Sequence, residues 1–404
     1  MKVAVIGLGV EGKKAIKSLK NRNHQIYATD LNKEIILKEK DVDLDLGFHD
    51  EDKIFSADAV ALSPGLWQTA LGKKVKKSKI LLSDKINSHR SIFTIGVTGT
   101  NGKTTTSFLI KSILEKAGID VLIGGNAGGG FDGYSELILE ADGDKYQAMI
   151  VEVCDMTLDY AEHCFDFDLV VATNIGSDHL NHHQSLENYA HNLGAFLKSK
   201  HSLLNKQDKY LVEISKNLVN FSFYDKTSYP LLLFGEFNKI NAGAAETVAQ
   251  FLKIKQDIIK DSLENFNPIK GRIKSFNIQG SHIVVGKTDN VGAIQEVLKE
   301  EDFPVLVVGT PRKEEKWRFQ ILEEVYKSHP ETIILFPGLE DTTSLAVKKL
   351  ISLGFEGEVK IIKELNQLPE IIKPYLSFKN IFIGGNGQNK IMKIQNYIES
   401  LSKG

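Results

Sequence analysis

The sequence predicts an α/β protein of three consecutive domains, which we place at residues 1–90, 91–271 and 272–404. Two observations predict this class. Short apolar, β-prone runs alternate with amphipathic helical segments along most of the 404 residues, and glycine-rich turns follow two of these runs. With 42% hydrophobic and 25% charged residues, the chain has the composition of a globular protein and enough length for more than one core.

Bulk properties exclude several function classes. A formal net charge of −2 argues against general binding to nucleic acid or to anionic membranes. The two cysteines, Cys154 and Cys164, form no C-x-x-C motif, so we expect a reducing compartment and no disulfide framework. The N-terminus enters a strand without a signal peptide, and no apolar run approaches the roughly 18 residues of a membrane span. We therefore expect a cytoplasmic monomer without membrane insertion.

The first domain opens with a β-prone run at residues 2–6 and the glycine pattern G-x-G-x-x-G, followed by a helical pattern. A second run ends in an acidic residue about 20 residues later, and a third, at 59–62, leads into a Ser-Pro-Gly turn. This predicts a Rossmann-like nucleotide site, formed by Gly7, Gly9, Gly12, Asp30, Ser63, Pro64 and Gly65. Because the unit closes by residue 90, it suits a mononucleotide head such as UDP better than NAD. A plain turn between strand and helix is the alternative interpretation.

The second glycine-rich turn has the pattern of a phosphate loop, with a β-prone run to Val97, the loop, and an amphipathic segment to residue 117. Gly99 and Gly102 would let backbone N–H groups surround phosphate oxygens at a helix N-terminus. Lys103 would reach the β- and γ-phosphates, and the Thr104 hydroxyl would bind Mg²⁺. The usual spacing wants a glycine at Val97, and here it stands one residue earlier. A tight turn without a ligand is the alternative, and the main prediction is use of ATP.

Polar residues end the next β-prone runs. Glu152 closes the run at 148–152, Asn174 closes the run at 169–174, and Asp178-His179 follows. The carboxyl ends of parallel strands form the crevice where such sheets bind ligands, so these side chains are candidates for the same site. Segments 185–204 and 238–252 are predicted to be helices. After residue 272, predicted strands at 304–308, 332–336, 359–362 and 380–384 alternate with predicted helices at 314–328, 342–353, 367–376 and 389–402, which indicates a second Rossmann-like domain.

Together, these motifs resemble the Mur ligase family, whose members join amino acids to UDP-linked cell-wall precursors. The match covers most of the chain. Residues 96–105 are similar to the family's phosphate loop, including the offset first glycine. Further matches are Gly125-Asn126-Ala-Gly128 to G-N-x-G, Glu152 to a strand-end glutamate, Asn174 with Asp178-His179 to N-x-x-x-D-H, residues 235–244 to G-x-H-N-x-x-N-x-x-A with Phe237 in place of histidine, and Gly271-Arg272 to G-R.

The resemblance implies an ATP- and Mg²⁺-dependent amide ligase that joins a free amino acid to a UDP-linked sugar or sugar-peptide precursor. It implies catalytic roles for Lys103, Glu152 and His179, and metal ligation by Thr104, Glu152 and His179. The implied ATP-binding residues are Gly99, Thr100, Asn101, Gly102, Lys103, Thr104, Thr105, Asn126, Asn238, Asn241 and Arg272. The short first domain implies a UDP site at the seven residues named above. The incoming amino acid would contact Lys287, Asn290, Gly385 and Asn386.

Three positions depart from the family pattern. Leu193 stands where many members carry a metal-site lysine, although the alanine-adding branch also lacks that lysine. Val285 replaces a leading aspartate, for which the nearby Asp289 could substitute, and Val-Cys-Asp-Met-Thr follows Glu152 in place of a serine- or acid-rich stretch. A divergent bacterial alanine- or glutamate-adding ligase and an archaeal pseudomurein peptide ligase both fit. A nucleotide-binding protein with weak or no ligase activity and an NAD-dependent oxidoreductase remain as alternatives.

Some residues have competing interpretations. Asp178, His179, His182 and His183 could form a zinc site, but we favour His179 beside Mg²⁺ and expect His182 and His183 to be solvated. Cys154 is expected to be a buried thiol, not a nucleophile. Trp67 could stack on a nucleotide base or pack in the core. Lys198 and Lys200 are expected to be exposed helix residues.

Overall fold

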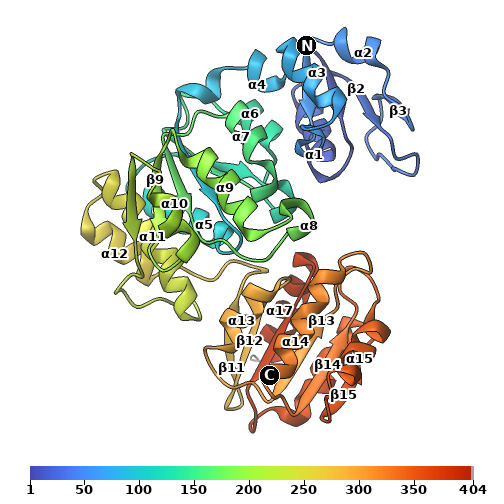
Figure 1. Ribbon diagram of the computed structural model, residues 1–404, viewed down its shortest axis with the longest axis vertical. Coiled ribbons are helices and arrows are strands. Elements are labelled where there is room, and N and C mark those ends of the chain that lie inside the picture. Colours follow the sequence, from blue (N-terminus) through green and yellow to red (C-terminus); the bar gives the residue numbers. More distant parts are fainter. Residues whose placement is uncertain (402–404) are drawn as a thin grey trace. The chain divides into compact units, whose positions relative to one another are not determined.

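The computed structural model describes residues 1–401, with the side chains of residues 180 and 181 left out (Figure 1). It divides into two compact units. The first comprises Met1–Ile175, His179–Asp225 and Gly243–Ile259, and the second comprises Gly176–Asp178, Lys226–Ala242 and the chain from Lys260 onward. The first unit contains two parallel sheets and the second contains one mixed sheet. This is the α/β architecture of three sheet domains that the sequence predicts.

The N-terminal sheet has four parallel strands in the order β3-β2-β1-β4. The strands are β1 (Lys2–Ile6), β2 (Gln25–Asp30), β3 (Asp43–Leu46) and β4 (Ala59–Leu62), and the helices are α1 (Val10–Asn21), α2 (Glu51–Phe55), α3 (Ala70–Ser78) and α4 (Leu82–Lys85). Strand β3 was not predicted because it is a short edge strand whose residues are partly or fully exposed. Without a buried face, such a strand shows no alternation of apolar and polar residues in the sequence.

The central sheet has six parallel strands in the order β10-β9-β8-β5-β7-β6. The strands are β5 (Phe93–Thr98), β6 (Val121–Gly125), β7 (Ala148–Glu152), β8 (Leu169–Ala172), β9 (His201–Asn205) and β10 (Phe221–Tyr224). The helices are α5 (Lys103–Lys116), α6 (Tyr134–Glu140), α7 (Leu158–Cys164), α8 (Leu180–His183), α9 (Leu186–Leu197), α10 (Lys209–Ser215), α11 (Glu236–Phe251) and α12 (Gln256–Glu264). The predicted helix at 185–204 was wrong beyond residue 197, because residues 201–205 form β9. A short buried apolar run has no period that separates helix from strand.

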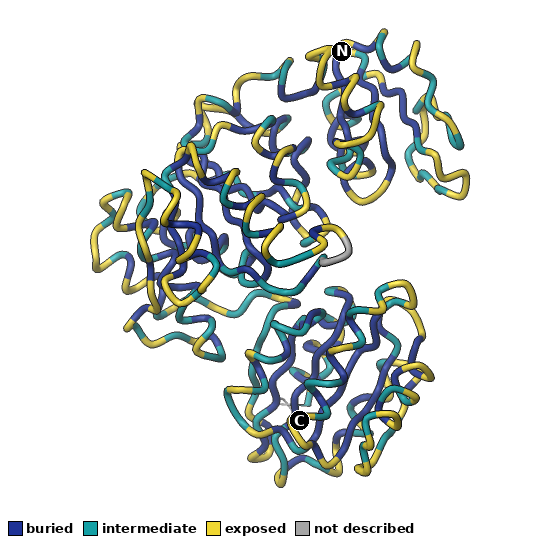
Figure 2. Tube along the Cα trace, in the orientation of Figure 1, coloured by how far each residue is buried: buried dark blue, intermediate teal, exposed yellow. Residues whose placement is uncertain are grey.

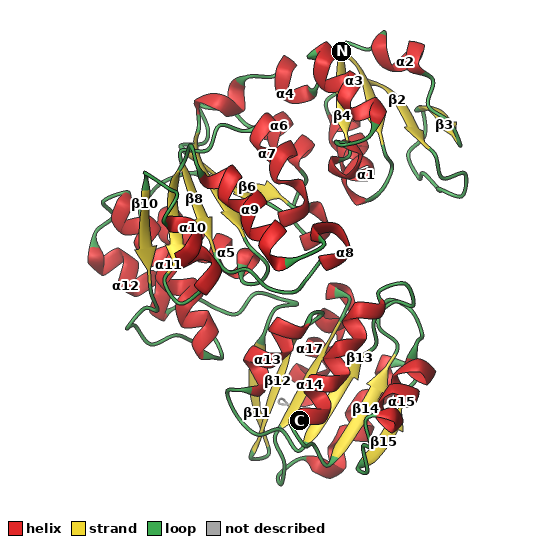
Figure 3. Ribbon diagram, viewed as in Figure 1, coloured by secondary structure: helices red, strands yellow, loops and turns green. Residues whose placement is uncertain are grey.

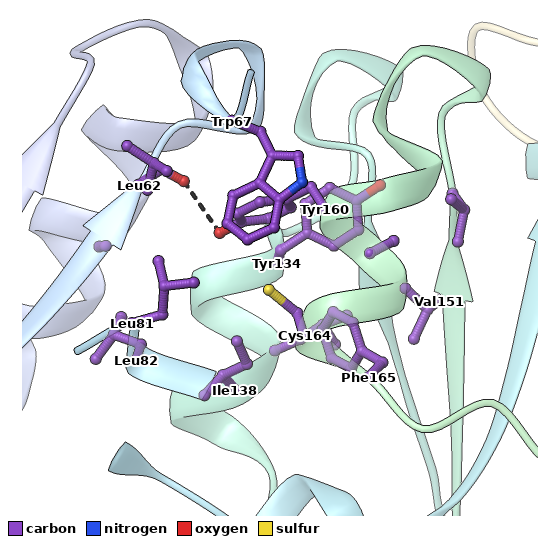
Figure 4. Close-up of a cluster of buried hydrophobic side chains, with 14 of the residues drawn as sticks. Leu62, Trp67, Leu81, Leu82, Tyr134, Ile138, Val151, Tyr160, Cys164 and Phe165 are labelled. Carbon is purple, nitrogen blue, oxygen red and sulfur yellow. Dashed lines mark hydrogen bonds between the residues drawn. The ribbon is translucent and has the colours of Figure 1, made fainter. Parts of the chain in front are cut away.

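One hydrophobic core cluster contains residues of both of the first two sheets. Figure 2 colours the chain by burial, and long stretches of both sheet regions are buried. Figure 4 shows where they meet: Leu62, Trp67, Leu81 and Leu82 from the N-terminal elements lie against Tyr134, Ile138, Tyr160 and Phe165 from the central ones. The Tyr160 hydroxyl donates a hydrogen bond to the Leu62 carbonyl oxygen at 3.0 Å. Trp67 is a core residue, packed edge-on against Tyr160 with ring centroids 5.3 Å apart. Of the two interpretations of Trp67, core packing is therefore confirmed.

The third sheet lies in the second unit and has the order β11-β12-β16-β13-β14-β15, with β11 antiparallel to β12 and the other pairs parallel (Figure 3). The strands are β11 (Lys274–Ile278), β12 (Ser281–Lys287), β13 (Val305–Gly309), β14 (Thr332–Phe336), β15 (Glu358–Ile361) and β16 (Ile381–Gly385). The helices are α13 (Val291–Leu298), α14 (Ile321–Lys327), α15 (Thr343–Ser352), α16 (Leu368–Ile372) and α17 (Gln388–Leu401). Two apolar clusters cover its two faces.

The four predicted strand-helix repeats of the third sheet are present, and the first three of their helices are shorter than predicted. Residues 316–320 form a 3-10 turn before α14, and α16 has only five residues followed by another 3-10 turn. Residue 402, the predicted end of the last helix, lies outside the described residues. In the part of the chain that the structure describes, no helix is long and apolar enough to span a membrane.

Candidate functional site

The phosphate loop lies at the centre of the central sheet. Strand β5 is flanked by β8 and β7, and its carboxyl end leads through residues 99–102 into α5, which begins at Lys103. Gly99 has φ of 125°, and a Cβ there would lie 2.2 Å from Thr173 Oγ1, so only glycine allows this close approach. The Thr100 N–H donates to the Asn174 carbonyl oxygen at 2.9 Å, and the Asn101 N–H donates to Asn174 Oδ1 at 3.0 Å. The end of β8 therefore holds the loop in shape.

Lys103 lies in the first turn of α5, where its ammonium faces the loop. Its Nζ donates to the carbonyl oxygens of Gly99 and Thr100, at 2.6 and 2.9 Å. This geometry places a positive charge at the mouth of the loop, beside the positive end of the helix dipole. Both features favour an anion, and phosphate oxygens would replace the loop carbonyls as partners of the ammonium.

A buried carboxylate next to the loop connects three of the predicted site residues. Glu152 ends β7 and is 1% exposed. Its Oε2 accepts a hydrogen bond from the Thr104 hydroxyl at 2.7 Å, and its Oε1 accepts one from Asn126 Nδ2 at 3.0 Å. Burying a carboxylate is costly without partners, and hydroxyl and carboxylate oxygens are the donors that Mg²⁺ prefers. The residue types at this position therefore fit a magnesium ion between Thr104 and Glu152.

A second buried carboxylate, Asp155, escaped the sequence analysis. His179 Nδ1 lies 3.2 Å from Asp155 Oδ2, and His183 Nε2 lies 2.7 Å from the same oxygen. Burial alone would raise the pKa of Asp155, but the hydrogen bonds from the two histidines and the charge of Lys103 outweigh it and hold that pKa well below its usual range. The only signal in the sequence was its place three residues after Glu152.

The expectation of a solvated His183 was wrong, whereas His182 is exposed as expected. The His183 side chain is 1% exposed, and its ring stacks on Tyr189 with centroids 4.3 Å apart. Because Tyr189 of α9 is buried in the core, the histidine ring that stacks on it is buried too. His183 is a positioning partner of Asp155, which the sequence could not indicate.

Ligand atoms of Cys154, Asp155 and His179 lie within 4.8 Å of one another, a grouping that could hold a metal ion. Cys154 is an unsuitable member for Mg²⁺, which prefers oxygen. Burial raises the pKa of its thiol to about 12, and the thiol donates to Asp155 Oδ1 at 3.4 Å. Cys154 is therefore buried, as expected.

The helix α9 carries a wholly apolar face at the position where a family lysine is missing. Leu193 is fully buried in the shared core. Lys200 does not act as a substitute: its side chain is 7% exposed, lies against Phe196, and donates to Glu162 Oε1 at 2.6 Å. The prediction that Lys200 is an exposed helix residue was therefore wrong, because a carboxylate and an aromatic face compensate its burial. Lys198 is exposed as expected.

The predicted precursor site lies at the carboxyl ends of the N-terminal strands. Gly7 and Gly9 lie between β1 and α1, and Gly12 lies in the first turn of α1. Asp30 ends β2, and Ser63-Pro64-Gly65 follows β4. The Leu8 N–H donates to Asp30 Oδ2 at 2.6 Å, and the Ser63 N–H donates to the Ile6 carbonyl oxygen at 2.8 Å. The strand order brings the three turns to one edge of the sheet.

The remaining predicted ATP-binding residues lie in the second unit. Asn238 and Asn241 lie one turn apart on α11, and Asn241 Nδ2 donates to Asn238 Oδ1 at 2.9 Å. Asn238 Nδ2 donates to the carbonyl oxygen of Phe234, which precedes the helix, at 2.8 Å. The Arg272 carbonyl oxygen accepts a bond from Gln395 of α17 at 2.6 Å, which anchors the segment before β11.

The predicted amino-acid site gathers at the carboxyl ends of β12 and β16, around an arginine that sequence reasoning did not select. Lys287 Nζ lies 3.1 Å from Asp289 Oδ2. The buried guanidinium of Arg318 lies 3.5 Å from Asp289, 3.2 Å from Glu315 and 3.3 Å from Asp178 of the same unit. Burial tends to raise the pKa of Asp289, but Lys287 and Arg318 lower it to about 2.

Two other predicted residues border this cluster. Asn290 caps α13 by accepting the Ala293 N–H at 2.9 Å, and Asn386 Nδ2 lies 3.4 Å from Glu315 Oε2, next to Gly385. Arg318 is one of only five arginines among 50 basic residues, and this scarcity was the one available signal.

The structure has a phosphate loop on a parallel sheet, with the Glu152 carboxylate and the Thr104 hydroxyl beside it, and two further sheet domains. This combination is the one expected of a nucleotide-dependent, three-domain ligase. Residues 97–285 match the model of the Mur ligase middle domain. This stretch of the chain is therefore a Mur ligase middle domain.

Individual proteins show how far the similarity extends. The UDP-N-acetylmuramoylalanine--D-glutamate ligase of Christiangramia forsetii is 26% identical over 316 residues, covering 68% of this chain and 69% of that protein. Among solved structures, a pseudomurein peptide ligase type C from Methanothermus fervidus gives a TM-score of 0.62 at 21% identity, covering 98% of this chain and 99% of the other. The UDP-N-acetylmuramate-alanine ligase of Thermotoga maritima gives 0.64 at 15% identity, covering 99% of each. At these identities, the two structures show a shared fold.

Proposed function

We propose that this chain is an ATP- and Mg²⁺-dependent ligase that joins a free amino acid to the carboxylate of a UDP-linked sugar or sugar-peptide precursor. The observation that carries the proposal is the contact of Glu152 with Thr104 and Asn126 beside the phosphate loop. In this proposal residues 1–90 bind the precursor, residues 91–271 bind ATP, and residues 272–404 bind the amino acid.

In this reaction the protein has to neutralise the charge of the phosphate groups and align the reacting carboxylate, phosphate and amine. A precursor carboxylate oxygen attacks the γ-phosphorus of ATP, so that ADP leaves and an acyl phosphate forms. The amine of the amino acid then attacks the carbonyl carbon, inorganic phosphate leaves, and the nitrogen loses a proton. In the first step, Lys103 and the N–H groups at the start of α5 hold the phosphate oxygens that gain charge. Magnesium bound by Thr104, Glu152 and His179 would supply further charge neutralisation when present.

Asp155 has a supporting role in this scheme. Its carboxylate fixes the rings of His179 and His183 from a buried position, so His179 can present one nitrogen in a defined direction. Carboxylates that orient a ligating histidine in this way commonly tune metal sites. We therefore add Asp155 to the proposed site as a positioning residue.

The remaining proposed contacts follow the sheet edges. Gly7, Gly9, Gly12, Asp30 and the Ser63–Gly65 turn would hold the precursor's nucleotide, and Asn238, Asn241 and Arg272 would contact ATP. Lys287, Asn290, Gly385 and Asn386 would surround the amino acid. Arg318 is already compensated by three carboxylates, so it serves to fix Asp289 and Glu315 in that pocket.

The biological setting is cell-wall peptide synthesis, of murein or of pseudomurein. The match of residues 97–285 to the Mur ligase middle domain favours a ligase over the NAD-dependent alternative. By their names, two of the similar proteins above are ligases of UDP-N-acetylmuramoyl or UDP-N-acetylmuramate precursors, and the third is a pseudomurein peptide ligase.

The test is product formation by mass. Purified protein is incubated with ATP, MgCl₂, pools of UDP-sugars and UDP-sugar-peptides, and one amino acid at a time. We expect phosphate release and a mass increase equal to the amino acid minus water. Lys103→Ala should abolish both, whereas Lys116→Ala on the exposed face of α5 should not. Absence of phosphate release with every combination would refute the proposed function.

A further inference from the structure

Helix α1 of the N-terminal sheet is bonded to the loop that carries Asn126. The helix packs on α6 and on the turn at residues 127–129. Glu11 Oε1 accepts the Ser135 N–H at 3.0 Å. Lys14 Nζ donates to the Phe131 carbonyl oxygen and lies 3.6 Å from Asp132 Oδ1. The connecting loop, residues 126–135, is therefore held by α1 at two points.

The Glu11 contact is built into both partners. Glu11 is 8% exposed, and a buried carboxylate is tolerated only with hydrogen-bond partners. A Cβ on Gly133 would lie 2.1 Å from Glu11 Oε2, so any other residue at 133 would displace the carboxylate. The absence of a side chain at Gly133 thus leaves the space that the Glu11 carboxylate occupies.

The other end of this loop reaches the ATP side of the molecule. Asn126 Nδ2 donates to Glu152, which also accepts the Thr104 hydroxyl. Phe131 stacks on Phe108 of α5, with ring centroids 5.3 Å apart and planes inclined by 18°. A continuous set of contacts therefore runs from the first turns of α1, through the loop, to Glu152 and the helix of the phosphate loop.

Glu11 is the second residue of α1 and lies between Gly9 and Gly12 of the glycine motif. A nucleotide bound at this turn would contact the first turn of α1, whose N–H groups face phosphate oxygens in such sites. Stiffening that turn would stiffen the loop bonded to it.

We propose that Glu11 and Lys14 are positioning residues that fix the 126–135 loop and couple occupancy of the glycine turn to the placement of Glu152. The coupling rests on the proposed function, whereas the fixing of the loop does not. A mechanical link of this kind would make the ATP side fully ordered only when the precursor is bound, which would limit wasteful ATP hydrolysis.

Hydrogen exchange read by mass spectrometry tests the positioning role without turnover. In Glu11→Ala and Lys14→Met, amides in residues 126–135 should exchange about tenfold faster than in the wild type, since each change removes a charge-assisted hydrogen bond. Glu11→Gln keeps an acceptor oxygen, so at pH 5, where Glu11 is mostly protonated, its exchange should stay close to the wild type. Lys13→Met, on the exposed side of the same helix, is the matched control. Unchanged exchange in both Glu11→Ala and Lys14→Met would overturn the positioning role.

The coupling has its own readout. Saturating UDP should slow exchange of residues 126–135 in the wild type and in Lys13→Met, and this protection should disappear in Lys14→Met. In ligase assays, Lys14→Met should raise the half-saturating Mg²⁺ concentration several-fold while saturating Mg²⁺ restores most of the rate. Either UDP protection that survives in Lys14→Met or its absence from the wild type would overturn the coupling. A wild type without ligase activity refutes the proposed function, and the exchange results still decide the positioning role.

Discussion

Glu11 should make the first unit less stable as pH rises through neutrality. Burial raises the pKa of Glu11 from 4.5 to about 7, partly offset by the Ser135 N–H and increased again by the nearby Glu136. At about 1.36 kcal/mol per pKa unit, the ionised form costs roughly 3 kcal/mol in the folded state. Because the folded pKa lies above the unfolded one, this stability is fully present below about pH 4.5 and is lost as pH rises through about 7.

The variant Glu11→Gln keeps an oxygen that accepts the hydrogen bond from the Ser135 N–H and removes the ionisable carboxyl group. The difference in unfolding free energy between this variant and the parent should shift by about 2–3 kcal/mol in favour of the variant between pH 5 and pH 8. Urea unfolding can be followed through Trp67, which is 5% exposed in the shared core, after Trp317→Phe removes the tryptophan of the second unit. Glu34→Gln, at an exposed carboxylate in the segment between β2 and β3, is the control. If Glu11→Gln and the parent lose stability in parallel over this range, the reasoning from burial is refuted.

Three further predictions follow from the central sheet. Asp155→Asn should raise the half-saturating Mg²⁺ concentration of the ligase reaction about 10–100-fold, because His179, the proposed metal ligand, loses its carboxylate partner, whereas the exposed His182→Gln should change it little. Leu193→Ala should lower the urea-measured stability by about 2–5 kcal/mol if this position is core; an effect below about 1 kcal/mol would contradict that placement. Burial raises the pKa of both Cys154 and Cys164 to about 12, so neither should react with a colorimetric thiol reagent at pH 8, and both should react in urea; one fast thiol in the folded protein would disprove this.

Local features of the sequence were enough to predict the phosphate loop. A strand that ends at Thr98, glycines at 99 and 102, and a helix that begins at Lys103 depend on backbone preferences within a few residues. The same holds for the glycine turn at 7–12 and for the repeats of the third sheet. Errors occurred where the period was weak, as in β3 and β9, or where a helix was divided by a 3-10 turn.

The partners of side chains could not be predicted in this way. Asp155 meets His183 across 28 residues, and Lys200 meets Glu162 across 38. The expectation of exposure for His183 and Lys200 rested on polarity, which gives a correct answer only when no compensating group lies nearby in space. The core that joins the first two sheets depends on the same kind of distant contact, since Trp67 packs on Tyr160.

The sequence by itself determined the three-domain α/β class and the motifs of the family, because strand, turn and helix signals are local and the order of motifs is fixed along the chain. Only the tertiary structure decided that Glu152 holds Thr104 and Asn126 together, that Asp155 orients two histidines, and that Glu11 of the first sheet reaches Ser135 across 124 residues. The physical reason is that a buried carboxylate must find its hydrogen-bond partners wherever the fold brings them, and no period or propensity encodes that distance.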